Sequence, residues 1–168
     1  GDEVLVLTLS GGLSGTINSA QLAKDMSGYD PITIIDTRQA IITQRMLVDE
    51  LKAHYGDQLP PVRINTNGHA NLINGRDVCP ELKGRIDTLS ISLNANNAAD
   101  YVALCHPIQG EEAYQAMLDF AKESKTYVPH VVFTVVDKGT DPAEIEESRS
   151  IAQSLGVQLR VRAYICLL

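Results

Sequence analysis

The stretch Leu5-Val-Leu-Thr-Leu-Ser-Gly-Gly-Leu-Ser-Gly-Thr16 joins an apolar run to an amphipathic segment. The apolar run stops at Ser10, two glycines follow, and Ser14 opens the amphipathic segment. This order predicts a buried strand, a tight glycine turn and a helix whose first N–H groups face the turn. Such a turn suits a carboxylate or phosphate, although the same residues also suit a plain strand-to-helix connection. No Gly-Lys-Ser/Thr follows, so the stretch is not a Walker loop.

The same strand-then-helix order continues along the rest of the chain. Apolar runs predict strands at residues 4–9, 32–36, 62–67, 86–94, 131–136 and 157–165, and most are separated by segments with helical periodicity. The clearest helix signal lies at Asp141-Pro-Ala-Glu144, where a cap residue, a proline and an acidic residue precede an apolar face that ends before Gly156. Six alternating βα units predict an α/β fold with a mainly parallel sheet, in a single domain over residues 1–168.

The predicted strands are of two kinds. The first is apolar on both faces and the second nearly so, which is typical of an open doubly wound sheet of the Rossmann or flavodoxin type. The third, fourth and sixth alternate between apolar and polar residues, which favours a partial (β/α) barrel with a polar lumen. Both architectures stay open at this point. The polar faces place Arg63, Arg160 and Arg162 on the lumen side, where an anion or acidic partners would offset their charge.

Composition limits the classes of function. The formal net charge of -7 disfavours a nucleic-acid partner. The cysteines, Cys79, Cys105 and Cys166, are widely spaced and lack metal-ligand spacing, so we expect reduced thiols, a cytoplasmic location, and neither a metal nor a cofactor. No apolar run is long enough to span a bilayer. An exposed apolar sheet face would favour a homodimer.

The first 46 residues resemble the DegV family of fatty-acid-binding proteins. The resemblance rests on the strand and turn from Asp2 to Ala20, with its Leu-Ser-Gly-Thr, and on the strand end Ile34-Ile-Asp-Thr37. It implies that Ser10 helps to hold an acyl carboxylate, and the candidate binding residues of the turn are Ser10, Gly11, Gly12, Ser14, Gly15 and Thr16. The family's earlier threonine-bearing segment and its second, tail-enclosing domain have no counterpart in this sequence.

Residues 47–164 resemble the later strands of a radical SAM protein of the TatD-associated group. The resemblance rests on Arg63-Ile-Asn-Thr-Asn-Gly68, Ile91-Ser-Leu-Asn-Ala95 and Leu159-Arg-Val-Arg-Ala-Tyr164, among other stretches. It implies a partial (β/α)6 barrel in which Asn67, Ser92 and Asn94 approach the SAM molecule. The Cys-x-x-x-Cys-x-x-Cys loop that holds an iron–sulfur cluster is missing, and the three cysteines present cannot replace it on spacing grounds.

These features lead to three hypotheses about function. The first is a chimeric scaffold, engineered or recombined, in which two unrelated segments join between Thr43 and Pro61 and no catalysis occurs. The second is a small-ligand binder that holds a fatty-acid carboxylate, a phosphate or a SAM-like nucleotide at the Ser10–Thr16 turn and the polar sheet face. The third is an enzyme, as a remnant of the radical SAM type. The sequence supplies no nucleophile–base pair, so we expect no catalytic residues.

Overall fold

A computed structural model describes residues 4–8, 16–36, 41–137, 139 and 142–163. The chain divides into two compact units, residues 1–59 (unit 1) and residues 60–168 (unit 2). The boundary lies inside the interval from Thr43 to Pro61 in which the two resemblances were expected to join. Each unit is described separately below, and the single domain expected from the sequence stays a prediction.

Unit 1 contains two parallel strands and the helix that connects them. Strand β1 (Val4–Thr8) pairs in register with β2 (Ile32–Asp36), and α1 (Thr16–Ser27) packs against both strands. The pair is closed at one end by a hydrogen bond of 2.8 Å from the Val4 N–H to the Pro31 carbonyl. Helix α2 (Ile41–Tyr55) and the short 3-10 helix η1 (Gly56–Gln58) follow and pack on each other.

Unit 1 is less buried than its sequence predicts. The strand expected to be buried exposes Val4 and Leu5, with 42% and 45% of their surface accessible. On α2, the apolar side chain of Met46 is 60% exposed. A sheet of two strands offers too little area to cover apolar side chains on both faces, so apolar composition alone did not produce burial.

Unit 2 contains a four-stranded sheet in the order β3-β4-β5-β6, with every neighbouring pair parallel. Its elements are β3 (Arg63–Thr66), α3 (Ala70–Asn74), η2 (Cys79–Leu82), β4 (Thr88–Ser92), α4 (Ala98–Cys105), α5 (Glu112–Ser124), β5 (His130–Asp137), α6 (Pro142–Leu155) and β6 (Gln158–Ala163). The predicted α/β class with parallel sheets is therefore confirmed. Strand order follows sequence order without reversal, which is the arrangement of consecutive strands in a barrel.

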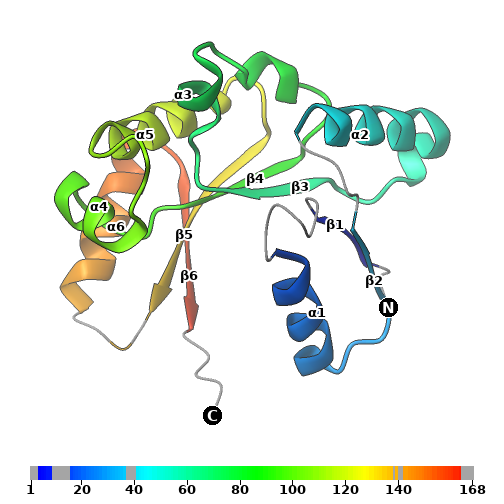
Figure 1. Cartoon of the computed structure of the whole chain (residues 1–168), viewed down its shortest axis with the longest axis horizontal. Helices are drawn as coiled ribbons and strands as arrows, with labels where there is room; N and C mark the ends of the chain where they lie inside the picture. The colour runs from blue at the N-terminus through cyan, green and yellow to red at the C-terminus, as the bar shows by residue number, and fades with distance from the viewer. Residues whose placement is uncertain (1–3, 9–15, 37–40, 138, 140–141, 164–168) are drawn as a thin grey trace. The chain divides into compact units, whose positions relative to one another are not determined.

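One face of this sheet carries the helices. Right-handed crossovers between consecutive parallel strands place all connecting helices on the same side, and Figure 1 shows α3, α4, α5 and α6 gathered there. Leu89, Ile91, Val131 and Phe133 point to that side and are buried. They pack with the inner faces of α4 and α5, including Tyr101 and the largely inaccessible residues Ala113, Met117, Phe120 and Ala121, to form the core.

The polar segment that follows β3 contains the short helix α3. Gly68 precedes it with φ +80°, and a Cβ at this position would lie 2.9 Å from the Met117 Cγ and 3.1 Å from the Ile91 Cγ2. The chain therefore passes so close to α5 that only glycine fits there. Leu72 on α3 packs on the core. This segment therefore forms a packed helical turn although its composition is polar.

Candidate functional site

The second face of the four-stranded sheet is polar and no described helix of unit 2 packs on it. The parallel registers align Asn65, Ser90, Val132 and Gln158 in one row across the four strands. Residues two positions away along each strand share this face, since side chains alternate along a strand. The predicted alternation of the third, fourth and sixth strands is therefore confirmed. We call this surface the arginine face; its residues are Arg63, Asn65, Thr88, Ser90, Ser92, His130, Val132, Thr134, Val136, Gln158, Arg160 and Arg162.

Arg63 leans across the arginine face from the edge strand β3. Its Nη2 donates to the Ser90 Oγ at 2.9 Å, and its Nε donates to the Asn65 Oδ1 at 3.1 Å. Ser90 lies on the neighbouring strand β4 and is buried, so this contact fixes the guanidinium over the inner part of the sheet. Partial burial lowers the pKa of Arg63, and the charges of Arg160 and Arg162 lower it further.

Arg160 and Arg162 approach from β6, the opposite edge strand of the same sheet. Together with Val136 they line a shallow depression along the second half of β6. Within the part of the chain that the structure describes, no carboxylate forms an ion pair with Arg63, Arg160 or Arg162. The Asp87 Oδ2 accepts from the Val62 N–H at 2.7 Å, and the Asp137 Oδ1 accepts from the Gly139 N–H at 2.8 Å.

The other candidates of unit 2 have different environments. Ser92 lies on the arginine face, in the row that β5 and β6 continue with Thr134 and Arg160. Asn67 follows β3, and its Oδ1 accepts from the His69 N–H at 3.3 Å. Asn94 has φ 59°, and its amide donates to the Cys105 Sγ on α4 at 3.4 Å. The fold therefore brings Ser92 together with the arginines and engages Asn94 in a contact with α4.

The candidates of the opening turn lie mostly outside the described residues. This applies to Ser10, Gly11, Gly12, Ser14 and Gly15. Thr16 is the first residue of α1, in agreement with a helix that starts directly after the predicted turn. The first turn of α1 contains no acidic residue, so no carboxylate of that turn repels an anion near its N–H groups.

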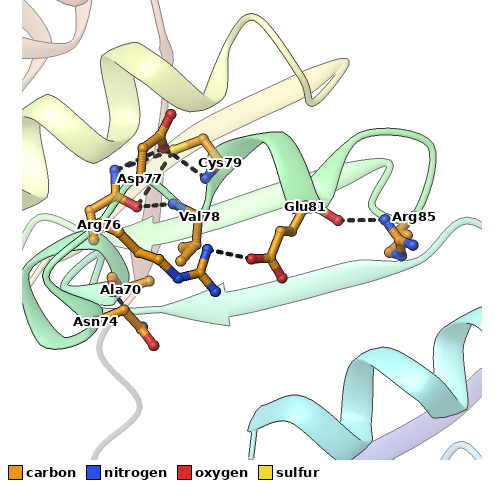
Figure 2. Close-up of polar contacts among 9 residues, drawn as sticks. Ala70, Asn74, Arg76, Asp77, Val78, Cys79, Glu81 and Arg85 are labelled. Atoms are coloured by element: carbon orange, nitrogen blue, oxygen red, sulfur yellow. Dashed lines mark hydrogen bonds and ion pairs between the residues drawn. The ribbon is translucent and has the colours of Figure 1, made fainter.

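A cluster on the helix side of unit 2 has donors of the kind that bind metals. One ligand atom each of Asp77, Cys79 and Glu123 lies within 4.8 Å of the others. The Asn71 amide donates to Asp77 at 3.2 Å and to Glu123 at 2.8 Å, while the Asp77 Oδ1 accepts from the Cys79 N–H, as Figure 2 shows for the last pair. Burial raises the pKa of Cys79 to about 11. The hydrogen bonds that Asn71 and Asp77 accept from the backbone N–H groups of Val78 and Cys79 hold the loop before η2.

Sequence reasoning missed a buried polar pair behind the sheet. The Tyr101 hydroxyl lies 3.0 Å from the His69 Nε2, and both residues are almost inaccessible. Burial lowers the pKa of His69 and raises the pKa of Tyr101 to about 12, so both side chains are neutral near pH 7. Because His69 follows Asn67 and Gly68, the sequence predicts a solvated loop residue. In the structure His69 is the residue before α3, and its side chain is buried.

Among the described residues, no helix combines the length and the apolar character needed to cross a bilayer. This agrees with the hydropathy of the sequence, in which no such run was found.

Comparison with known proteins agrees with the resemblance of the first segment. Residues 1–64 match the family model described as DegV, an uncharacterised protein family. No curated protein and no solved structure matches the chain. The match spans β1, α1, β2, α2 and η1 and ends within β3, beyond residue 46, where the resemblance was expected to end. This N-terminal part of the chain is therefore similar to the DegV family.

Proposed function

We propose that this protein is a non-catalytic binder of a fatty-acid carboxylate, held by the segment from Ser10 to Thr16. The observation that carries the proposal is the family match over residues 1–64, which contains this segment. A strand-turn-helix segment is suited to the task because N–H groups at a helix start attract a carboxylate. The hydroxyl of Ser10 would add a donor to the same oxygen atoms.

The described parts of unit 1 support this assignment. Strand β1 ends at Thr8 and α1 begins at Thr16, so residues 9–15 connect the carboxyl end of a parallel strand to a helix start. Ligands of parallel α/β folds bind at that end of the strands. Apolar side chains of α1, Leu22 and Met26, are 48% and 47% exposed and offer surface of the kind that an acyl chain contacts.

The test is calorimetric titration of the delipidated protein with oleate, for the wild type and two variants. Ser10→Ala removes the proposed carboxylate donor, and we expect affinity to fall about tenfold, which corresponds to roughly 1.4 kcal/mol. Thr33→Ala removes a hydroxyl from an exposed position of β2, at the other end of the strand pair, and should leave affinity unchanged. Oleate binding of equal strength by the wild type and Ser10→Ala contradicts the proposal.

The chimeric origin and the radical SAM resemblance of residues 47–164 stay predictions, since the family match covers residues 1–64 alone. This match runs across the whole interval from Thr43 to Pro61, so it gives no support to a join inside that interval. A natural homologue that also runs unbroken over residues 65–164 would contradict the joining of two unrelated segments. Heat of binding on titration with SAM would favour the radical SAM alternative over a scaffold.

A further inference from the structure

We call the part of the arginine face between Arg63 on β3 and Arg160 and Arg162 on β6 the trough. Its two inner strands present mainly serine, threonine and valine side chains, together with His130 on β5, whereas its edge strands carry the arginines. β3 and β6 are three strand spacings apart, roughly 14 Å. Along the strands, Arg63 lies in the row of Thr88 and His130, four residues before the row of Thr134 and Arg160. Because Arg63 reaches inward to the Ser90 Oγ, its guanidinium narrows this gap from the β3 side. Mainly small side chains therefore lie in the middle of the trough, and positively charged side chains lie at its two edges.

No carboxylate of the described residues pairs with the arginines of this trough. Arg63, Arg160 and Arg162 gather on one face without an ion pair to any described carboxylate, in a chain whose formal net charge is -7. Like charges brought together cost free energy, and a fold retains them where an anion neutralises them. The repulsion is felt at Arg63, since both arginines of β6 lower its pKa.

The trough also offers hydrogen-bond donors for an anion. Arg63 uses its Nε and one Nη for Asn65 and Ser90, which leaves the other Nη and its two protons free of described partners. The Ser92 hydroxyl makes no hydrogen bond to a described residue, and it lies in the row of Arg160. Guanidinium groups and hydroxyls are the donors that bind phosphate oxygens in proteins.

We propose that the arginine face binds a small anion with two linked phosphate groups, between Arg63 on one side and Arg160 and Arg162 on the other. Three guanidinium charges match the charge of about three that a diphosphate carries, and their spread across the sheet exceeds the size of one phosphate. A nucleic acid fits this surface less well, since the acidic chain repels a long polyanion beyond the trough. The site is independent of the proposed carboxylate site of unit 1.

The test is calorimetric titration of the full chain at 150 mM salt with inorganic pyrophosphate, orthophosphate and a nucleoside diphosphate. We expect pyrophosphate to bind at one site per chain and at least tenfold more tightly than orthophosphate. A nucleoside diphosphate that binds more tightly than pyrophosphate identifies an ester as the ligand, and equal binding identifies the free diphosphate; both support the proposal. Absence of pyrophosphate heat, or a stoichiometry well above one, overturns it.

Variants of single arginines test the location of the site. Arg63→Gln and Arg160→Gln should each weaken pyrophosphate binding about tenfold or more. Arg149→Gln is the matched control, because Arg149 is an exposed arginine of α6 that pairs with Glu146 at 3.2 Å on the helix side. Equal weakening by Arg149→Gln and Arg160→Gln would show a merely general charge effect and overturn the proposal.

Two further measurements distinguish a loss of pyrophosphate binding from a loss of folding, and the proposed phosphate site from the carboxylate site of unit 1. Without ligand, Arg160→Gln should keep or raise the melting temperature, because it relieves repulsion; a marked fall means that the arginine is structural and overturns its role in binding. Pyrophosphate affinity should be unchanged in Ser10→Ala and in the presence of oleate. Displacement of pyrophosphate by oleate would overturn the separation of the two sites, whereas failure of oleate to bind would contradict only the proposed function of unit 1.

Discussion

The two units use the same parallel βα arrangement but differ in how much they bury. Every buried apolar side chain in the described part of the chain belongs to unit 2, from Cys79 to Val157. In unit 1 the described residues include a single buried one, Thr8, whose hydroxyl donates to the Ile35 carbonyl. Four strands covered by helices on one face enclose a core, and two strands with one packed helix do not.

The comparison teaches that apolar composition and burial are separate properties. Strand β1 is the most apolar strand by sequence, yet it is more exposed than β4, whose residues alternate with serine and threonine. The difference arises because β4 has a strand on each side and a layer of helices, whereas β1 has one neighbour within its unit. Burial therefore depends on the number of packing partners, which composition does not encode.

The largest difference in stability between the two units is expected from truncating a core side chain. Phe133→Ala empties a fully buried site in unit 2 and should lower the free energy of unfolding by about 3–5 kcal/mol. Met46→Ala in unit 1 should change it by less than about 0.5 kcal/mol, since Met46 is 60% exposed. Urea denaturation measures the free energy of unfolding of both variants. Similar losses would contradict the difference in burial between the two units.

A smaller effect is expected from adding a methyl group at Gly68. Gly68→Ala strains a residue with φ +80° and forces the new Cβ against Met117. Gly75→Ala is the matched control, because Gly75 has φ +60° but open space around it. The control should cost about 1 kcal/mol from backbone strain alone, and Gly68→Ala about 1–3 kcal/mol more. Equal unfolding midpoints for the two variants would show that α5 does not confine the chain at Gly68.

The buried pair behind the sheet predicts a further loss of stability. Tyr101→Phe leaves the His69 Nε2 without its partner in a buried site and should cost about 1–3 kcal/mol. Tyr127→Phe removes a hydroxyl from a partly buried tyrosine without a described hydrogen bond, and should be close to neutral. Thermal unfolding of both variants checks this, and a neutral Tyr101→Phe would mean that the hydrogen bond adds nothing.

The smallest effect concerns pH. Burial lowers the pKa of His69 below its ordinary value of 6.5, so the unfolded chain takes up this proton at a higher pH than the folded chain does. The corresponding stability is present above about pH 6.5 and is lost as pH falls through the lowered pKa. Urea midpoints between pH 7.5 and 5 should therefore fall less in His69→Gln than in the wild type. Equal slopes in His69→Gln and the wild type would contradict this role of His69.

The sequence alone determined most of the local structure and the class of the fold. The cap signal at Pro142 and Glu144 predicted α6, and the alternation of β4 and β6 predicted one polar and one apolar face. These predictions held because capping, turn chemistry and the period-two pattern of a strand are local properties. The resemblance of the first segment to the DegV family rests on a local pattern of the same kind, whereas the predicted turn at Ser10 lies outside the described residues.

Only the tertiary structure decided which residues meet. It joined Arg63 to Ser90 across 27 positions and brought Arg63 within electrostatic reach of Arg160 and Arg162 on the far edge strand. It also turned His69 inward and left Val4 and Leu5 exposed. These outcomes depend on strand order, on register and on how many layers cover a strand. A single sequence determines which side chains share a face, and the packing of distant segments determines what covers that face.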